Sequence, residues 1–341
     1  MNSLSVTIGG DFLSSPGRVH FHPMTPLDIF LNRHARLRSG WRLIIFCAAY
    51  SAALAAFFST VYAILFLLKI PDVGAQFAGT LGFVVQSFIL FVTALVVGWA
   101  CGRLFESLPL RALGWAPHRG WLRDLLIGSL LGVLSLMLAA LVATVFRGFQ
   151  FSVASSISNV AFVKTFFGSA VIFILAAAAE EMLFRGYPLQ TMMRALPFLA
   201  AVIPSSVLFA YVHLDNPNVA WGFTFLNTTL AGFWLAVAYL RTRSLWFPLG
   251  LHWAWNWAMG ALLGLPVSGI TSLTRAPLLR ATDAGPTWLT GGAYGIEGGA
   301  ACTLALVVST IFIWKTRLLK ADEELKKFTD EEVPKTVTSD E

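Results

Sequence analysis

Charge is scarce in this chain of 341 residues. Only 12% of its residues are Asp, Glu, Lys or Arg, whereas 57% are hydrophobic, and the mean hydropathy is +0.71. A soluble globular domain carries about 25% charged residues, so this composition excludes that class. We expect an all-α, polytopic bundle of about eight transmembrane helices.

Cysteines and recognised short motifs are also few. Cys47, Cys101 and Cys302 lie in apolar segments at unrelated spacings, which indicates neither a disulfide framework nor a metal site. The first forty residues are polar and contain no apolar core, so we expect no cleaved signal peptide. The sequence contains no evident internal repeat, which disfavours many transporter architectures. It also lacks the His-Glu-x-x-His helix that is typical of zinc proteases.

Runs of about 20 apolar residues mark candidate transmembrane helices. Eight such runs occur, at 42–68, 80–101, 125–146, 166–192, 197–214, 219–240, 246–264 and 298–314. The predicted organisation is a polar cytoplasmic segment at 1–40, a transmembrane domain at 41–316 and a charged cytoplasmic tail at 317–341. Residues 265–297 form a loop that contains Gly, Pro and Thr, and we interpret it as a connector in preference to a lid.

The formal net charge of +6 arises from basic residues at the ends of alternate spans. These residues are Arg33, Arg36, Arg38, Arg42, Arg103, Arg111, Arg119, Arg123, Arg241, Arg243, Lys315, Arg317 and Lys320. Because cytoplasmic loops are enriched in Lys and Arg, the pattern predicts that both termini are cytoplasmic. We expect an integral protein of a prokaryotic plasma membrane, in contact with lipids and without a nucleic-acid partner.

Three charged residues interrupt the fourth span, and they are Glu180, Glu181 and Arg185. Each charge costs about 2.5–3.5 kcal/mol at the centre of a bilayer, so such residues are usually functional. Glu181 and Arg185 are four residues apart, in the order that favours an ion pair on a helix. Glu180 points about 100° away, and we expect it to face a cavity and exchange protons. The alternative is that all three only hold helices together, although one ion pair needs only one glutamate.

Two further polar pairs follow on later spans. Phe209 and His213 end the fifth span, where a lone histidine is more often an interfacial residue than a catalyst. His252 and Asn256 are four residues apart on the seventh span, so both can direct N–H groups to one point, as a developing oxyanion requires. The tryptophans interleaved with them are typical of the membrane interface or of packing.

The motif series Glu180-Glu-x-x-x-Arg185, Phe209-x-x-x-His213 and His252-x-x-x-Asn256 resembles that of the CAAX protease and bacteriocin-processing family of intramembrane proteases. The resemblance covers about residues 165–260. It includes a basic turn before the third motif, in which Arg243 stands where a glycine is frequent.

The resemblance implies a membrane-proximal or lipidated peptide or protein substrate and a water molecule activated by Glu180 and His213. His252 and Asn256 would stabilise the oxyanion, while Glu181, Arg185 and Phe209 would support the site. The family mechanism that we favour uses no cofactor. The alternative is a zinc-dependent protease whose ligands are Glu180, His213 and His252.

Two other classes of function remain as alternatives. One is a non-catalytic scaffold or bacteriocin immunity factor, and the other is a transporter in which the buried charges relay protons. Straight, full-length helices would place Glu180 and His213 near the middle of the bilayer and His252 near the cytoplasmic surface. We therefore expect either that the fifth or the seventh span is tilted, broken or displaced, or that the span boundaries above are wrong by several residues.

Overall fold

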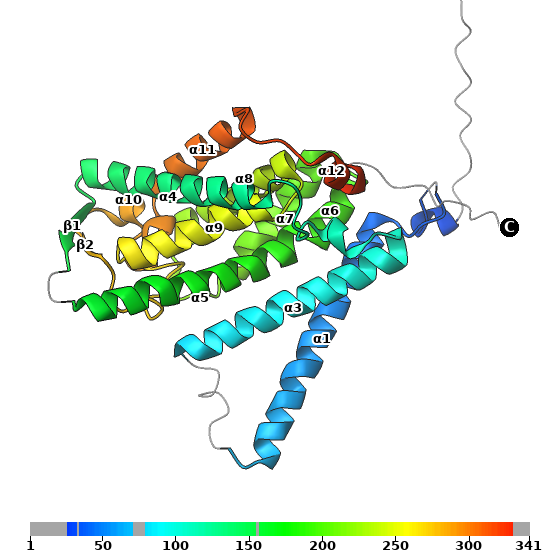
Figure 1. Cartoon of the computed structure of the whole chain (residues 1–341), viewed down its shortest axis with the longest axis horizontal. Coiled ribbons are helices and arrows are strands. Elements are labelled where there is room, and N and C mark those ends of the chain that lie inside the picture. The colour runs from blue at the N-terminus through cyan, green and yellow to red at the C-terminus, as the bar shows by residue number, and fades with distance from the viewer. Residues whose placement is uncertain (1–25, 33, 71–78, 155–156, 330–341) are drawn as a thin grey trace, which may run out of the picture.

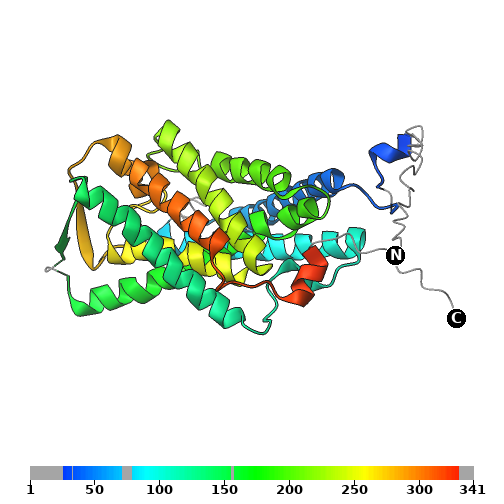
Figure 2. The ribbon, with the colours of Figure 1, turned by 90° about the horizontal axis from the view of Figure 1, so that it is seen from above.

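The computed structural model describes residues 26–32, 34–70, 79–154 and 157–329, which form an elongated bundle of helices (Figure 1 and Figure 2). The long helices are α1 (Ser39–Leu67), α3 (Gly79–Glu106), α4 (Trp121–Val145), α5 (Asn159–Arg185) and α8 (Trp221–Thr242). The shorter ones are α6 (Tyr187–Met193), α7 (Phe198–Val212), α9 (Trp246–Trp257), α10 (Thr287–Thr290), α11 (Ala300–Lys315) and α12 (Glu323–Thr329). Short 3-10 helices are η1 (Pro26–Ile29), η2 (Leu110–Leu113), η4 (Gly292–Tyr294) and η5 (Ile296–Gly298), and η3 (Ala258–Leu262) is a π-helical turn. The expected all-α membrane bundle is confirmed.

Not every predicted span is a full-length helix. Among the described residues, five helices are long and apolar enough to cross a membrane, at Ser39–Leu67, Gly79–Glu106, Trp121–Val145, Asn159–Met193 and Trp221–Thr242. The other three candidate spans coincide with α7, α9 and α11, which have 15, 12 and 16 residues. At 1.5 Å per residue, α9 is about 18 Å long, well short of the hydrocarbon core of about 30 Å. Hydropathy alone therefore predicts more full-length helices than the structure contains.

Glycines let α4 and α9 pack with their backbones in contact. A Cβ atom on Gly132 of α4 would collide with the carbonyl of Leu251, and one on Gly250 of α9 would collide with the carbonyl of Leu125. Gly128 and Gly132 are four residues apart on the same face of α4, which is the spacing of close-packed membrane helices. This contact fixes the position of α9 in the bundle.

A buried charge cluster joins α1, α3 and α6. The carboxylate of Glu106 accepts hydrogen bonds from Arg42 Nη1 at 2.7 Å and from Arg194 Nε and Nη2 at 2.7 and 2.9 Å. In Figure 1, α1 and α3 lie together at this end and diverge away from it. Glu106 was not predicted from the sequence as a buried charge, yet it is only 3% exposed. Glu106 lies in the last turn of α3, just after the hydrophobic run, where an acidic residue is not unusual in sequence.

The C-terminal helix α12 packs on the same end of the bundle. Arg194 Nη1 donates a hydrogen bond to the carbonyl of Phe328 at 3.1 Å, and Arg111 pairs with Glu324 at 2.6 Å. Leu325 of α12 is buried. This part of the predicted tail is therefore docked. The predicted segment 1–40 lies mostly outside the described residues, and so does the tail after residue 329.

The segment after α9 is pinned at several points. Strand β1 (Phe149–Val153) pairs antiparallel with strand β2 (Leu279–Asp283), in the register Phe149↔Asp283 to Val153↔Leu279. Near the other end of the segment, Asn227 Nδ2 of α8 donates to the carbonyls of Glu297 and Gly299 at 2.8 and 2.9 Å. The structure thus adds anchors that a simple connector does not need.

Candidate active site

Helix α5 carries the glutamate doublet in its last third, and the two side chains diverge. The Glu180 side chain is 33% exposed and lines a cavity, whereas the side chains of Glu181 and Arg185 are fully buried. The predicted Glu181–Arg185 ion pair is present, with Oε1 and Nη1 3.3 Å apart. Helical geometry therefore separates one glutamate for packing and one for the cavity, as the spacing predicts.

Arg185 neutralises Glu181 and also ties three helices together. Its Nη2 donates to the carbonyl of Gly232 on α8 at 3.1 Å. Its guanidinium lies 4.5 Å from the ring centroid of Phe209 on α7, in a cation–π contact. Phe209 in turn lies against the His213 ring, with centroids 4.5 Å apart. Phe209 thus links the buried ion pair to the second motif.

Glu181 also binds a histidine of α9. Its Oε1 accepts a hydrogen bond from His252 Nδ1 at 2.8 Å. A carboxylate can only accept, so Nδ1 carries the proton and Nε2 is the ring nitrogen left for the cavity. His213 is oriented in the same way, because its Nδ1 donates to the carbonyl of Phe209 at 2.6 Å. Backbone and carboxylate acceptors thus set the tautomers of both rings.

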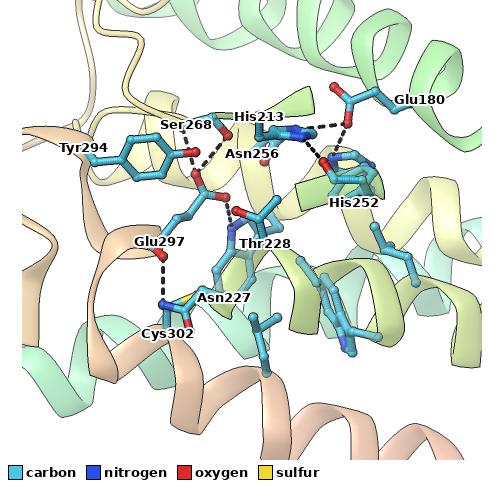
Figure 3. A pocket seen from close by; sticks show the side chains of 16 residues that line it. Glu180, His213, Asn227, Thr228, His252, Asn256, Ser268, Tyr294, Glu297 and Cys302 are labelled. Carbon is cyan, nitrogen blue, oxygen red and sulfur yellow. Dashed lines mark hydrogen bonds and ion pairs between the residues drawn. The ribbon is translucent and has the colours of Figure 1, made fainter. Parts of the chain in front are cut away.

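The two free ring nitrogens converge on Glu180. Its Oε2 lies 3.7 Å from His213 Nε2 and 3.7 Å from His252 Nε2 (Figure 3). These separations exceed a direct hydrogen bond, whose usual limit is about 3.2 Å, and suit groups that share a small molecule between them. Asn256, one helical turn after His252, lines the same cavity. The structure therefore brings all three motifs together.

Short helices explain how residues from different expected depths meet. Helix α7 ends at Val212, so His213 is its C-cap, and α9 ends at Trp257 before the π-helical turn η3. Gly186, with φ −69° and ψ −137°, ends α5 directly after Arg185. The predicted spans 197–214 and 246–264 are thus longer than the α-helices α7 and α9 that they contain. Neither α7 nor α9 extends over a full bilayer thickness.

The basic turn before α9 contains Arg243, which stands where a glycine is frequent in the family that the motifs resemble. Arg243 caps the C-terminus of α8 in the left-handed conformation, with φ +55°. Glycine adopts this conformation without steric cost, whereas a side chain does not. The turn therefore has the geometry that a glycine would favour, and it precedes the site without contributing a cavity-lining side chain.

The cavity has a volume of about 50 Å³, enough for one or two water molecules because each occupies about 30 Å³ in the liquid. One end is lined by Glu180, His213, His252 and Asn256. The other end is lined by Ser268, Tyr294 and Glu297, which come from the segment after α9 (Figure 3). The sequence analysis missed these three residues. The one sequence feature that could have pointed to them is Glu297, an acidic residue within the glycine-rich run 295–299 and directly before an apolar helix.

The zinc alternative requires a set of metal ligands. Among the described residues, no group of three or more His, Cys, Asp or Glu side chains has the arrangement of a metal site. The zinc alternative, with Glu180, His213 and His252 as ligands, stays a prediction, and a chelator experiment tests it.

Comparison with known proteins agrees with the motifs. Residues 162–258 match the family model described as Rce1-like, type II CAAX prenyl endopeptidase. No curated protein and no solved structure matches the chain significantly. The matched segment contains Glu180, His213, His252 and Asn256, and its bounds lie close to those of the predicted motif core. The chain is therefore an integral membrane protein in which residues 162–258 are similar to the Rce1-like, CAAX-type protease family.

Proposed function

We propose that this protein is an intramembrane endopeptidase that hydrolyses a peptide bond of a membrane-proximal peptide or protein, with water as the nucleophile. The observation that carries the proposal is the convergence of His213 Nε2 and His252 Nε2 on Glu180 Oε2, each at 3.7 Å, in one small cavity. A scaffold gains nothing from a partly exposed carboxylate between two oriented histidines.

In this mechanism, Glu180 is the general base and His213 orients the water. Neutral His213 donates from Nδ1 to Phe209, so its Nε2 accepts one hydrogen of the water while Glu180 accepts the other. The water oxygen bonds to the peptide carbonyl carbon as its proton passes to Glu180. Glu180 then returns that proton to the leaving nitrogen as the C–N bond breaks. One carboxyl thus acts as base and then as acid.

The oxyanion is stabilised by His252 and Asn256. His252 can donate from Nε2 only in its doubly protonated form, because Nδ1 already carries the proton directed at Glu181. The Glu181 carboxylate stabilises that imidazolium, as an acidic partner does for a catalytic histidine. Asn256 supplies a second, neutral N–H. Removing one such donor typically lowers kcat by about 10²–10³.

The zinc mechanism and the scaffold are outcomes of the same experiment. Wild-type protein and Glu180→Gln are compared in detergent for cleavage of a library of membrane-proximal peptides, including prenylated ones, with and without a chelator. Loss of cleavage in folded Glu180→Gln, with no effect of the chelator, supports the proposal. Activity that is lost with chelator and restored by zinc supports the metal mechanism. A wild type that cleaves nothing supports the scaffold.

A further inference from the structure

The cavity contains a second carboxylate that the catalytic scheme does not use. Glu297 lies in η5, outside the matched segment 162–258 and outside all three motifs. Its Oε2 accepts from the backbone N–H and the hydroxyl of Ser268 at 2.7 and 3.1 Å, and its Oε1 accepts from Trp255 Nε1 at 3.1 Å (Figure 3). One side chain thus joins the start and the end of the segment after α9 to α9 itself.

The backbone that carries Glu297 is itself fixed. Asn227 Nδ2 donates to the carbonyls of residues 297 and 299, and Asn227 Oδ1 accepts from Thr303 Oγ1 at 2.6 Å. A Cβ atom on Gly299 would collide with the carbonyl of Leu289, so this glycine is needed for the close packing. The Glu297 carboxylate is therefore held in place from α8 and α11 and does not depend on substrate for its position.

The chemistry of the contacts requires an acceptor. Two N–H groups, from Ser268 and Trp255, point at the two oxygens of Glu297, and a carboxylate offers acceptors at both. An amide in the same place would turn an NH₂ group toward one of these donors. Burial raises the pKa of Glu297 and the donors oppose that rise. Burying the ionised form of Glu297 therefore costs desolvation free energy, and departures of this kind from ordinary folding preferences are expected at functional sites.

Trp255 connects Glu297 to the helix that carries the proposed oxyanion donors, because its indole N–H binds Glu297 and it lies on α9. It is buried on α9 between His252 and Asn256 in the sequence, and its indole packs edge-on against Trp234 of α8, with ring centroids 5.7 Å apart. A hydrogen bond to the indole therefore restrains the rotation and the axial position of the helix that presents both donors.

We propose that Glu297 is a positioning residue, which sets α9 through Trp255 and the outer wall of the cavity through Ser268, so that His252 and Asn256 meet the reacting carbonyl. This inference rests on the proposed protease function. Misplacing reacting groups by about 1 Å can cost about 100-fold in rate, so the expected effect is on kcat.

The experiment compares Glu297→Gln and Trp255→Phe with the matched control Asp283→Asn. Asp283 is an acid of the same segment that accepts from Gly285 N–H and Thr290 Oγ1 at 3.1 and 2.9 Å, and both of these donors belong to that segment and not to α9. For a cleaved reporter peptide, we expect kcat to fall at least about 10-fold in the first two variants, with KM changed less than about 3-fold. Asp283→Asn should leave kcat within about 2-fold of wild type. The double variant Glu297→Gln/Trp255→Phe should lose no more than the stronger single variant, because the two residues share one contact.

A second readout does not depend on cleavage. Hydrogen–deuterium exchange of the α9 amides should be faster in Glu297→Gln and Trp255→Phe and unchanged in Asp283→Asn. Unchanged exchange and unchanged kcat in folded Glu297→Gln would overturn the positioning role, as would equal losses in Asp283→Asn. If wild type cleaves no peptide but the exchange pattern holds, the protease function fails and the link from Glu297 to α9 stands.

Discussion

Glu181 and His252 share a buried hydrogen bond of 2.8 Å between α5 and α9, and through it the buried ion pair reaches the candidate active site. Arg185 binds the same oxygen of Glu181 at 3.3 Å. The three residues therefore form a chain in which Glu181 Oε1 accepts from both neighbours and so places a proton on His252 Nδ1. Glu181 therefore has both a structural contact, with Arg185, and a contact with a proposed catalytic residue, His252, so substitutions of Glu181 can test the two separately.

Replacing Glu181 should separate the two roles. Glu181→Ala leaves Arg185 buried without its carboxylate, which typically costs about 3–5 kcal/mol, so we expect a large fall in thermal stability in detergent. Glu181→Gln keeps an acceptor but does not stabilise the His252 imidazolium, so we expect a folded protein with kcat reduced about 10-fold or more. Full activity in a folded Glu181→Gln would contradict the charged form of His252 in the mechanism.

Asn256 offers a test of the oxyanion site. We expect Asn256→Ala to lower kcat by about 10²–10³ and to leave KM nearly unchanged, because the lost N–H acts on the oxyanion and not on the bound substrate. Trp253→Phe is a suitable control. Trp253 is on the same helix and donates to Ser129 at 3.1 Å, but it does not line the cavity. A similar loss in both variants would indicate that α9 is merely destabilised.

The glycine contact between α4 and α9 should tolerate no side chain. Gly132→Val forces a branched side chain against the backbone of Leu251, and we expect it to separate α9 from α4, with loss of folded protein on size-exclusion chromatography and loss of activity. Gly168→Ala on α5 is the control, because nothing lies within 4 Å of the added Cβ. That change should be neutral, or stabilising by up to about 1 kcal/mol. A folded, active Gly132→Val would contradict the close approach.

Glu297 should make stability depend on pH with a defined sign. Burial raises its pKa above the ordinary value of 4.5, so the folded state binds the proton more tightly than the unfolded state does. The resulting stabilisation is complete below pH 4.5 and is lost as pH rises through the raised pKa. Glu297→Gln lacks this ionisation. We expect the Tm of wild type minus that of Glu297→Gln to fall from acidic toward neutral pH, and a constant or rising difference would contradict the raised pKa.

Sequence reasoning identified the membrane bundle and the cavity residues for different reasons. Charges in an apolar span are rare enough to stand out. The i, i+4 spacing of Glu181 and Arg185 also places both side chains on one face of a helix, so their ion pair can be predicted from sequence. Glu297 and Glu106 could not be found in this way, because both lie just outside hydrophobic runs, where an acid is ordinary. Their burial depends on contacts with residues far away in the sequence, such as Trp255 and Arg194.

The short lengths of α7 and α9 were also not predicted from the sequence. Hydropathy counts apolar residues and does not show where a helix ends, so the apolar π turn η3 and the turn after His213 were read as continuations of spans. The Gly128 and Gly132 pair was visible in the sequence, but its partner Gly250 lies more than 100 residues later. Only the fold shows that Gly128 and Gly132 lie against the backbone of α9 and that Gly250 lies against the backbone of α4.

The two-stranded ladder between β1 and β2 has a thermodynamic consequence for the outer wall of the cavity. A free segment of this length would sample many conformations at little cost, because loop-closure entropy grows only slowly with length. The ladder, the Asn227 contacts and Glu297 divide it instead into short pieces whose ends are already fixed. Moving the wall aside would break these contacts, so we expect this face of the protein to resist opening.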